Sequence, residues 1–124
     1  MTIVRIDHIN IAGSAELIAR CRAFYVDVLG LADGHRPPFR SRGFWLYAGD
    51  APVVHLTERD GNGVAHAGPF SHYAFQCEDL DAMSAKLKEH AIEFTIDHVP
   101  ATRQTQLFLH DPAGVPLELN FDAS

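Results

Sequence analysis

The predicted order of strands and helices occurs twice along the chain, and this limits the possible folds more than any other feature. In the first half, a strand-like run over 3–12 precedes an amphipathic stretch over 14–30 and three short strand-like runs over 31–35, 42–49 and 52–58. In the second half, a strand over 69–77 precedes a helix over 79–91 and three strands over 92–99, 105–111 and 114–121. We therefore predict an α+β fold of tandem βαβββ modules, about 1–60 and 68–124, in a single domain over 1–124.

Local sequence signals indicate where two of these elements begin and end. Ser14 is placed to cap the first helix and Gly30 to end it, and the residues between them have apolar side chains at the spacing of an amphipathic helix. Between the last two strands, Asp111–Gly114 has Asp, Pro and Gly where a type I turn favours them. We expect a tight hairpin there.

Four polar residues stand where a strand former would be ordinary: His8, His55, His72 and Glu118. His72 follows His8 by 64 residues, and Glu118 follows His55 by 63 residues. The four residues therefore occupy two equivalent pairs of positions in the repeated pattern. A coincidence of this kind favours a shared role over four independent ones.

Strand alternation predicts that all four side chains lie on one face. Because successive strand residues point to opposite faces, each of the four lies opposite apolar neighbours such as Val54 and Leu56. A sheet covered by helices on its apolar face would gather the four on its open face. Three imidazoles and one carboxylate suit a divalent metal such as Zn²⁺, Fe²⁺, Ni²⁺ or Mn²⁺. The alternative is a hydrogen-bonded polar network that lines a metal-free ligand cleft.

Further residues are candidates for contact with a substrate. Asn10 and Gln76 share the face of the candidate ligands, and Trp45 and Phe108 could line an apolar pocket. The segment 34–44 concentrates Arg36, Arg40 and Arg42, and it reads either as a clamp for an anionic substrate or as a solvated turn.

Composition excludes several classes of partner. The chain has a net charge of −6 and no basic stripe, which argues against nucleic acid and anionic membranes. The sequence contains no run of about 18 apolar residues, so it predicts no membrane span. Cys21 and Cys77 form no CxxC motif, so we expect a cytoplasmic protein with two free thiols.

The segments "DHINI", "SHYAF", "FYVDVLGL" and "DPAGVPLEL" resemble the vicinal oxygen chelate superfamily, which includes glyoxalase I, fosfomycin-resistance enzymes, extradiol dioxygenases and bleomycin-binding proteins. The resemblance covers nearly the whole chain, Ile3 to Phe121. It implies a curved mixed sheet that forms a cup around a divalent metal, with the helices on its outer face. It also implies a homodimer, in which His8 and His55 of one chain meet His72 and Glu118 of the other.

The same resemblance implies a reaction class. The metal would chelate two neighbouring oxygens of a small substrate, with Glu118 as the catalytic base, in lyase, isomerase or dioxygenase-type chemistry. The stretch over 69–94 is similar to fosfomycin-resistance transferases, whose metal triad carries over to His8, His72 and Glu118. A thiol transferase is therefore an alternative, as is a binding protein that sequesters a drug without chemistry.

Overall fold

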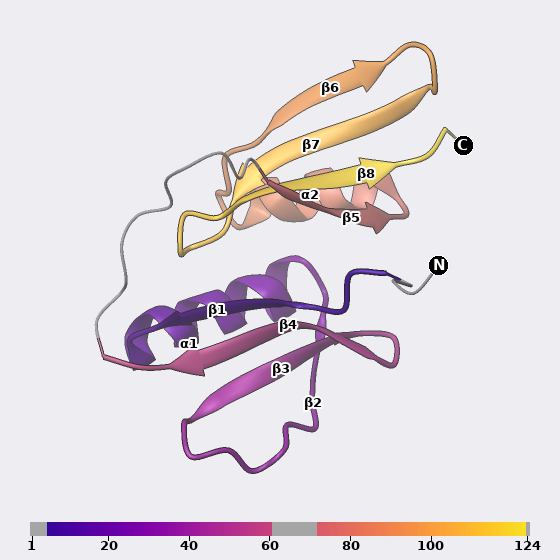
Figure 1. Cartoon of the computed structure of the whole chain (residues 1–124). Coiled ribbons are helices and arrows are strands. Elements are labelled where there is room, and N and C mark those ends of the chain that lie inside the picture. The colour runs from indigo at the N-terminus through magenta and orange to yellow at the C-terminus, as the bar shows by residue number, and fades with distance from the viewer. Residues whose placement is uncertain (1–4, 61–71, 124) are drawn as a thin grey trace. The chain divides into compact units, whose positions relative to one another are not determined.

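The computed structural model describes residues 5–60 and 72–123. The chain divides into two compact units, Met1–Gly63 and Val64–Ser124. Each unit contains a four-stranded sheet and an α-helix (Figure 1). The prediction of a single domain concerns how the two units are arranged, and it stays a prediction.

The first unit is a βαβββ module. Its sheet has the strand order β1-β4-β3-β2, in which β1 runs parallel to β4 and the other pairs are antiparallel. The elements are β1 (Ile9–Gly13), α1 (Ala15–Ala23), β2 (Ala32–Gly34), β3 (Gly43–Ala48) and β4 (Ala51–Glu58).

The second unit repeats the module. Its sheet has the order β5-β8-β7-β6, again with one parallel pair, between β5 and β8. The elements are β5 (Tyr73–Cys77), α2 (Leu80–Glu89), β6 (Thr95–Val99), β7 (Gln104–His110) and β8 (Pro116–Phe121). The predicted α+β fold with two βαβββ modules is confirmed.

Strand register places His55 and Glu118 at equivalent positions of the two modules. Asn10 pairs with His55 in the first sheet, and Ala74 pairs with Glu118 in the second. The pairs Trp45 with His55 and Phe108 with Glu118 are likewise equivalent. His55 and Glu118 therefore occupy the same place in their modules, each with an aromatic neighbour on the adjacent strand.

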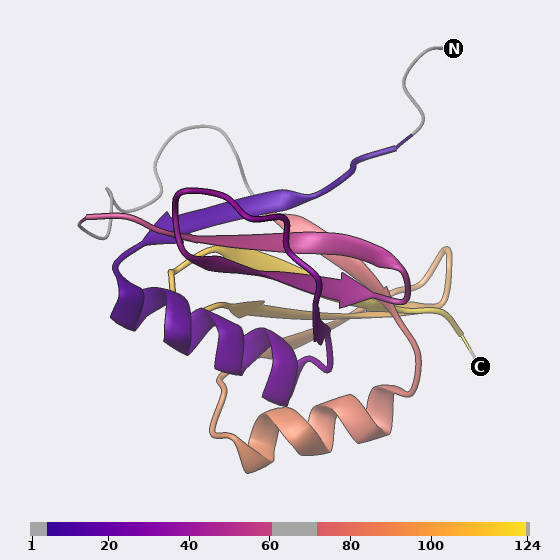
Figure 2. The ribbon, with the colours of Figure 1, turned by 90° about the horizontal axis from the view of Figure 1, so that it is seen from below.

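The core of the first unit lies between α1 and one face of its sheet (Figure 2). Leu17, Ile18 and Cys21 of α1 are buried, and they pack with the sheet residues Ile11, Leu46, Val54 and Leu56, which are also buried. Cys21 lies within this core, and among the described residues neither Cys21 nor Cys77 forms a disulfide. Among the described residues, no helix is long and apolar enough to cross a membrane.

Both ends of the first helical segment agree with the local signals. Leu17 N–H donates to Ser14 Oγ at 3.2 Å, and α1 begins at the next residue after Ser14. The expected single α-helix changes at Phe24–Val28 to a π-helical turn that buries Phe24, Tyr25 and Val28. Gly30 then reverses the chain with φ +85°, and Leu31 N–H donates to Tyr25 O at 2.9 Å.

The first strand of each unit begins later than predicted. Strand β1 begins at Ile9, so His8 precedes it, and His72 likewise precedes β5. The segment 5–8 is exposed throughout, with Ile6 84% exposed, and therefore has no buried face to hold it in the sheet. Residues 3–4 and 69–71 of the predicted strands lie outside the described residues.

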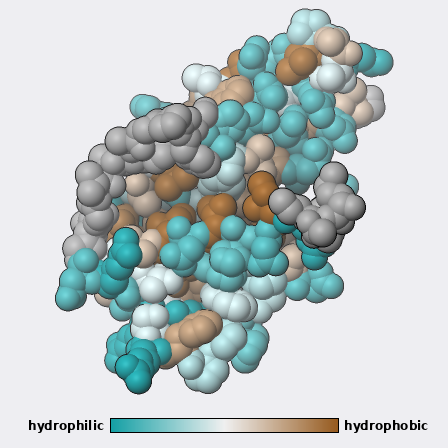
Figure 3. All heavy atoms as spheres, in the orientation of Figure 1, coloured by the Kyte–Doolittle hydropathy of each residue, from teal (hydrophilic) through white to brown (hydrophobic). Residues whose placement is uncertain are grey.

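The second unit is less completely covered by its helix. Leu87 is the fully buried residue of α2, whereas Leu80 and Met83 are half-buried. Strand β6 lies at the sheet edge and is mostly exposed, with Ile96 54% exposed. Figure 3 shows mainly hydrophilic residues over the end of this unit that holds β6 and β7, with single hydrophobic residues among them.

The hairpin between β7 and β8 gives a test of the fold. Asp111 is 4% exposed, and its Oδ1 accepts N–H groups from Ala113 and Val115 at 2.8 and 3.0 Å. Gly114 N–H donates to Asp111 O at 2.9 Å, which closes the predicted turn. We expect Asp111→Ala to lower the free energy of unfolding by about 2 kcal/mol, because two backbone donors lose their acceptor.

Urea denaturation of the full chain measures this loss. Asp111→Asn is the matched control, because its amide oxygen can still accept both N–H groups and should cost less than the alanine. Equal losses from the two variants would contradict the role assigned to Oδ1.

Candidate metal and substrate site

Three rings form a stack on the open face of the first sheet. His55, on β4, lies between His8 and Trp45, with ring centroids 3.7 and 4.0 Å away and interplanar angles of 12° and 9°. Its neighbours Val54 and Leu56 are fully buried on the opposite face, as strand alternation requires. The fold therefore brings His8, His55 and Trp45 together.

The chemistry of His55 fits a metal ligand. Its Nε2 is buried and has no hydrogen-bond partner in the described part of the chain. Burial, and then the charge of His8, lower the pKa of His55 below its ordinary value. The ring is therefore neutral at neutral pH, which is the form that binds a metal.

His8 is oriented by an acidic neighbour. Its Nδ1 lies 2.7 Å from Asp7 Oδ2, and the hydrogen bond from His8 lowers the pKa of Asp7. Because an ionised carboxylate can only accept, Nδ1 carries the proton, and a neutral His8 ring has its lone pair on Nε2. Asp7 thus fixes the tautomer of a candidate ligand, a role that carboxylates commonly have beside metal-binding histidines.

The second unit contains the equivalent pair. His72 Nε2 lies 3.2 Å from Oε1 of Glu118, which is on β8 and only 7% exposed. Gln106 Nε2, on β7, donates to the other carboxylate oxygen at 3.1 Å. Gln106 was not among the predicted site residues, although alternation along β7 puts it on the same face as Phe108.

The predicted substrate residues fall into three separate cavities. Asn10 and Trp45 line a pocket of about 230 Å³ in the first unit, together with His55. Phe108 and His72 line a cavity of about 950 Å³ in the second unit, where their rings lie edge to face with centroids 6.2 Å apart. Gln76 lines a third cavity, beside Cys77 and Arg103.

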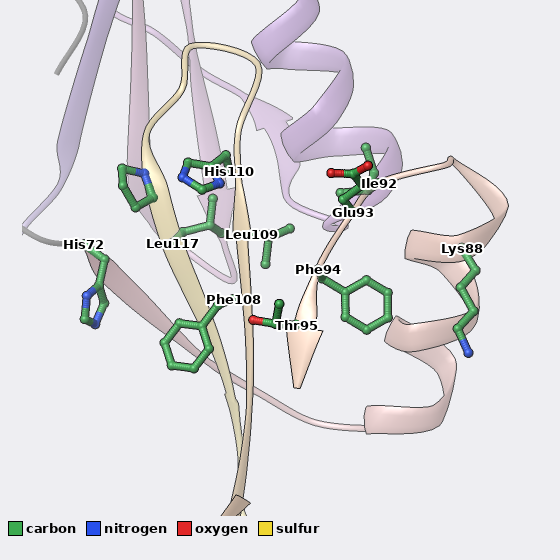
Figure 4. A pocket seen from close by; sticks show the side chains of 11 residues that line it. His72, Lys88, Ile92, Glu93, Phe94, Thr95, Phe108, Leu109, His110 and Leu117 are labelled. Carbon is green, nitrogen blue, oxygen red and sulfur yellow. The ribbon is translucent and has the colours of Figure 1, made fainter. Parts of the chain in front are cut away.

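Figure 4 shows from close by the cavity that His72 and Phe108 line. His72 and Phe108 lie at one side of it, and Lys88 comes from α2 on the other. Phe94, which precedes β6, and Thr95, the first residue of β6, lie between these two sides. The cavity thus has His72 at one side of a largely apolar hollow, while Glu118, the partner of His72, is not among its lining residues.

Within residues 5–60 and 72–123, no group of three or more His, Cys, Asp or Glu side chains could hold a metal ion. The four predicted ligands form instead one pair in each unit. A site that uses all four residues depends on how the pairs meet, and it stays a prediction.

Comparison with known proteins shows where this arrangement belongs. Residues 5–119 match the model of the Glyoxalase/Bleomycin resistance protein/Dioxygenase superfamily. The chain belongs to this superfamily. The resemblance drawn from the sequence segments is thereby confirmed.

Two relatives in this superfamily are similar in sequence. The protein YaeR of Escherichia coli, which is uncharacterized, is 30% identical over 93% of this chain and 94% of its own length. Glyoxylase I 4 of Arabidopsis thaliana is 32% identical over 77% of this chain, and the match spans 59% of that protein.

Solved structures of superfamily members have the same fold. A glyoxalase family protein from Bacillus anthracis superposes with a TM-score of 0.78 at 23% identity, covering 99% of this chain and 98% of the other. A glutamate-to-glutamine mutant of the fosfomycin resistance protein FosX from Listeria monocytogenes, in a complex with Mn(II) and dihydroxypropylphosphonic acid, has a TM-score of 0.74 at 14% identity, covering 98% of this chain and 95% of the other. At these identities the likeness concerns the fold.

Proposed function

We propose that this chain is a metal-dependent enzyme of the glyoxalase-like kind that acts on a small molecule with two neighbouring oxygen atoms. One observation carries the proposal: potential ligand pairs, His8 with His55 and His72 with Glu118, stand at equivalent positions of the two modules. The name of the Arabidopsis relative and the Mn(II) complex of FosX support the same class of chemistry.

The four side chains would hold Zn²⁺, Ni²⁺, Fe²⁺ or Mn²⁺, since imidazole and carboxylate groups suit these ions. The unpartnered Nε2 of His55 and the orientation of His8 by Asp7 support this assignment. When bound, the metal would supply Lewis-acid polarisation of the two substrate oxygens.

Glu118 is the proposed catalytic base. Gln106 holds its Oε2, which leaves Oε1 directed to His72 and available to accept a substrate proton. The proposed substrate contacts come from Asn10, Trp45, Gln76 and Phe108. Proton removal next to a polarised oxygen suits lyase or isomerase chemistry, and the same donor set suits dioxygenase chemistry.

The proposed active form is a homodimer. Each unit offers two of the four ligands, and metal sites in enzymes use at least three protein ligands as a rule. The pairs of both units are therefore needed at one site. The superfamily resemblance favours a meeting of the pairs from two chains.

Metal analysis tests the proposal. We expect the full chain, stripped with a chelator and reconstituted with each of the four ions in turn, to retain about one equivalent of at least one ion per chain. Elemental analysis after gel filtration measures the content, and light scattering on the same sample measures the molar mass. Less than about 0.2 equivalents of every ion would contradict the metal site, and a monomer that holds metal tightly would contradict the dimer.

A substrate screen of the loaded protein then separates the reaction classes. Consumption of 2-oxoaldehydes indicates glyoxalase-like chemistry, and consumption of catechols with oxygen indicates a dioxygenase. Consumption of fosfomycin with a thiol indicates a transferase. Binding of a drug by a protein without metal would indicate the sequestering alternative.

A further inference from the structure

The pocket that contains His55 also takes in one arginine. Arg36 comes from the loop between β2 and β3 and lines this pocket of about 230 Å³. The described lining holds that one permanent cation and no carboxylate, in a chain whose net charge is −6. The other lining residues are polar or aromatic: Asn10, Phe39, Ser41, Trp45 and Thr57.

The loop itself fixes the guanidinium of Arg36. One terminal nitrogen donates to Ser41 O at 2.9 Å, and the other donates to Ser41 Oγ at 3.2 Å. The ring of Phe39 lies against it, with its centroid 4.8 Å from Cζ. At Gly43 a Cβ would clash with the backbone oxygen of Leu56 and would also lie 3.1 Å from the same Cζ, so the glycine leaves room for both. The charge is thus held in place without a carboxylate partner among the described residues.

The guanidinium of Arg36 keeps N–H groups that no described residue accepts. Arg36 Nε is buried without a partner in the described residues, and further guanidinium N–H groups remain after the two bonds to Ser41. Asn10 Oδ1 accepts from Thr57 Oγ1 at 3.0 Å, which leaves the amide N–H groups of Asn10 as donors. Because buried polar groups nearly always have partners, the buried Nε of Arg36 is a donor that an anionic group in the pocket would satisfy.

We propose that this pocket binds a small oxyanion, a carboxylate or phosphonate group of the substrate, and that Arg36 is the residue that selects it. The assignment rests on the proposed function, because it puts the anion beside the proposed ligand His55. A planar guanidinium matches a carboxylate or phosphonate in geometry as well as in charge. Arg40 and Arg42 are exposed and do not line the pocket. The segment 34–44 is interpreted from its sequence either as a clamp for an anionic substrate or as a solvated turn. We therefore assign the anion clamp to Arg36 alone.

The chain has a built-in reporter for this test. Trp45 is its single tryptophan and lines the pocket. We expect glycolate or methylphosphonate to change its fluorescence saturably, and glycolamide, the neutral counterpart of glycolate, to bind at least about tenfold more weakly. Arg36→Gln should weaken anion binding roughly tenfold to hundredfold, because it removes the charge-assisted hydrogen bonds.

Three further variants separate selection of the anion from support of the loop. Arg40→Gln removes the same charge from an exposed position and should leave anion binding within about twofold. Ser41→Ala removes one hydrogen bond to Arg36 but keeps its positive charge. Arg36→Lys keeps the positive charge but removes the planar guanidinium. Both should bind the anion more tightly than Arg36→Gln, and Arg36→Lys decides the matter if the glutamine variant does not fold.

The proposal is overturned if glycolamide binds as tightly as glycolate, or if Arg36→Gln binds both anions like the wild type. Equal weakening by Arg40→Gln would also overturn it, since a general charge effect would then suffice. Titrations with and without metal separate this proposal from the metal site. Arg36-dependent anion binding by a chain that takes up no metal would refute the metal site alone. Normal metal uptake with Arg36-independent anion binding would refute the anion pocket alone.

Discussion

Glu118→Gln should weaken metal binding by at least about a hundredfold, because an amide replaces the only anionic ligand in the proposed set. The glutamine has nearly the shape of glutamate, and its amide oxygen can still accept from Gln106. The variant therefore tests charge and ligation, with little change in packing. A competition titration with a chromophoric chelator measures the dissociation constant.

Folding stability should respond in the opposite way. Glu118 is 7% exposed, and burying a carboxylate costs free energy that a neutral amide avoids in part. The metal-free variant should accordingly unfold at the same temperature as the wild type or a higher one. Excess metal should raise the unfolding temperature of the wild type and leave that of the variant nearly unchanged, since binding stabilises the native state by mass action.

Glu93→Gln is the matched control for this prediction. Glu93 is exposed and lines the same cavity as His72, and its replacement changes the net charge of the chain by the same amount. Its metal affinity should stay within about twofold of the wild type, because an exposed charge at a distance is largely screened. If Glu118→Gln binds metal as well as Glu93→Gln does, Glu118 is a structural partner of His72 and not a ligand.

Much of the fold could be predicted because its determinants are local or periodic. Alternation along β4 and β8 separates apolar from polar faces, and Ser14 and Gly30 mark the ends of the first helical segment through their own backbone preferences. The π-helical turn at Phe24–Val28 could not be predicted in this way. Its apolar spacing is compatible with an α-helix, and tertiary burial of Phe24, Tyr25 and Val28 accompanies the change.

The candidate site was predictable only in part. Repeat spacing identified both members of each pair, and the pairs do lie together within their units. The contact of Gln106 with Glu118 depends on which strands are neighbours in the sheet. The place of Arg36 in the pocket depends on how the loop between β2 and β3 folds. Neither follows from the periodicity of the sequence. Asp7 stands next to His8 in the sequence. Its hydrogen bond to the His8 ring depends on the fact that residues 5–8 are not part of β1, which begins at Ile9.

The two faces of β4 should separate stability from metal binding. Leu56 is fully buried and pairs with Ile11 on β1 and Phe44 on β3. Leu56→Ala should lower the free energy of unfolding by about 2–5 kcal/mol, through lost apolar burial and the cavity left behind. Metal affinity, measured well below the unfolding temperature, should stay within about threefold of the wild type, since the side chain points away from His55.

His55→Ala should have the converse effect. Its metal affinity should fall at least about tenfold, whereas the metal-free chain should lose about 1 kcal/mol, the contribution of ring stacking with Trp45 and His8. Urea denaturation in a chelator measures the stability of both variants, and the chelator competition measures their affinity.

The dependence of stability on pH gives a second readout for His55. Its pKa is lowered from the ordinary value of 6.5 in the folded chain, so the unfolded state binds more protons as the pH falls. The stability that neutral His55 contributes is therefore present above pH 6.5 and is lost as the pH falls towards the folded pKa. His55→Ala should reduce this slope and Leu56→Ala should preserve it. If His55→Ala instead keeps its metal and loses as much stability as Leu56→Ala, His55 is a packing residue and the proposed fourth ligand must be given up.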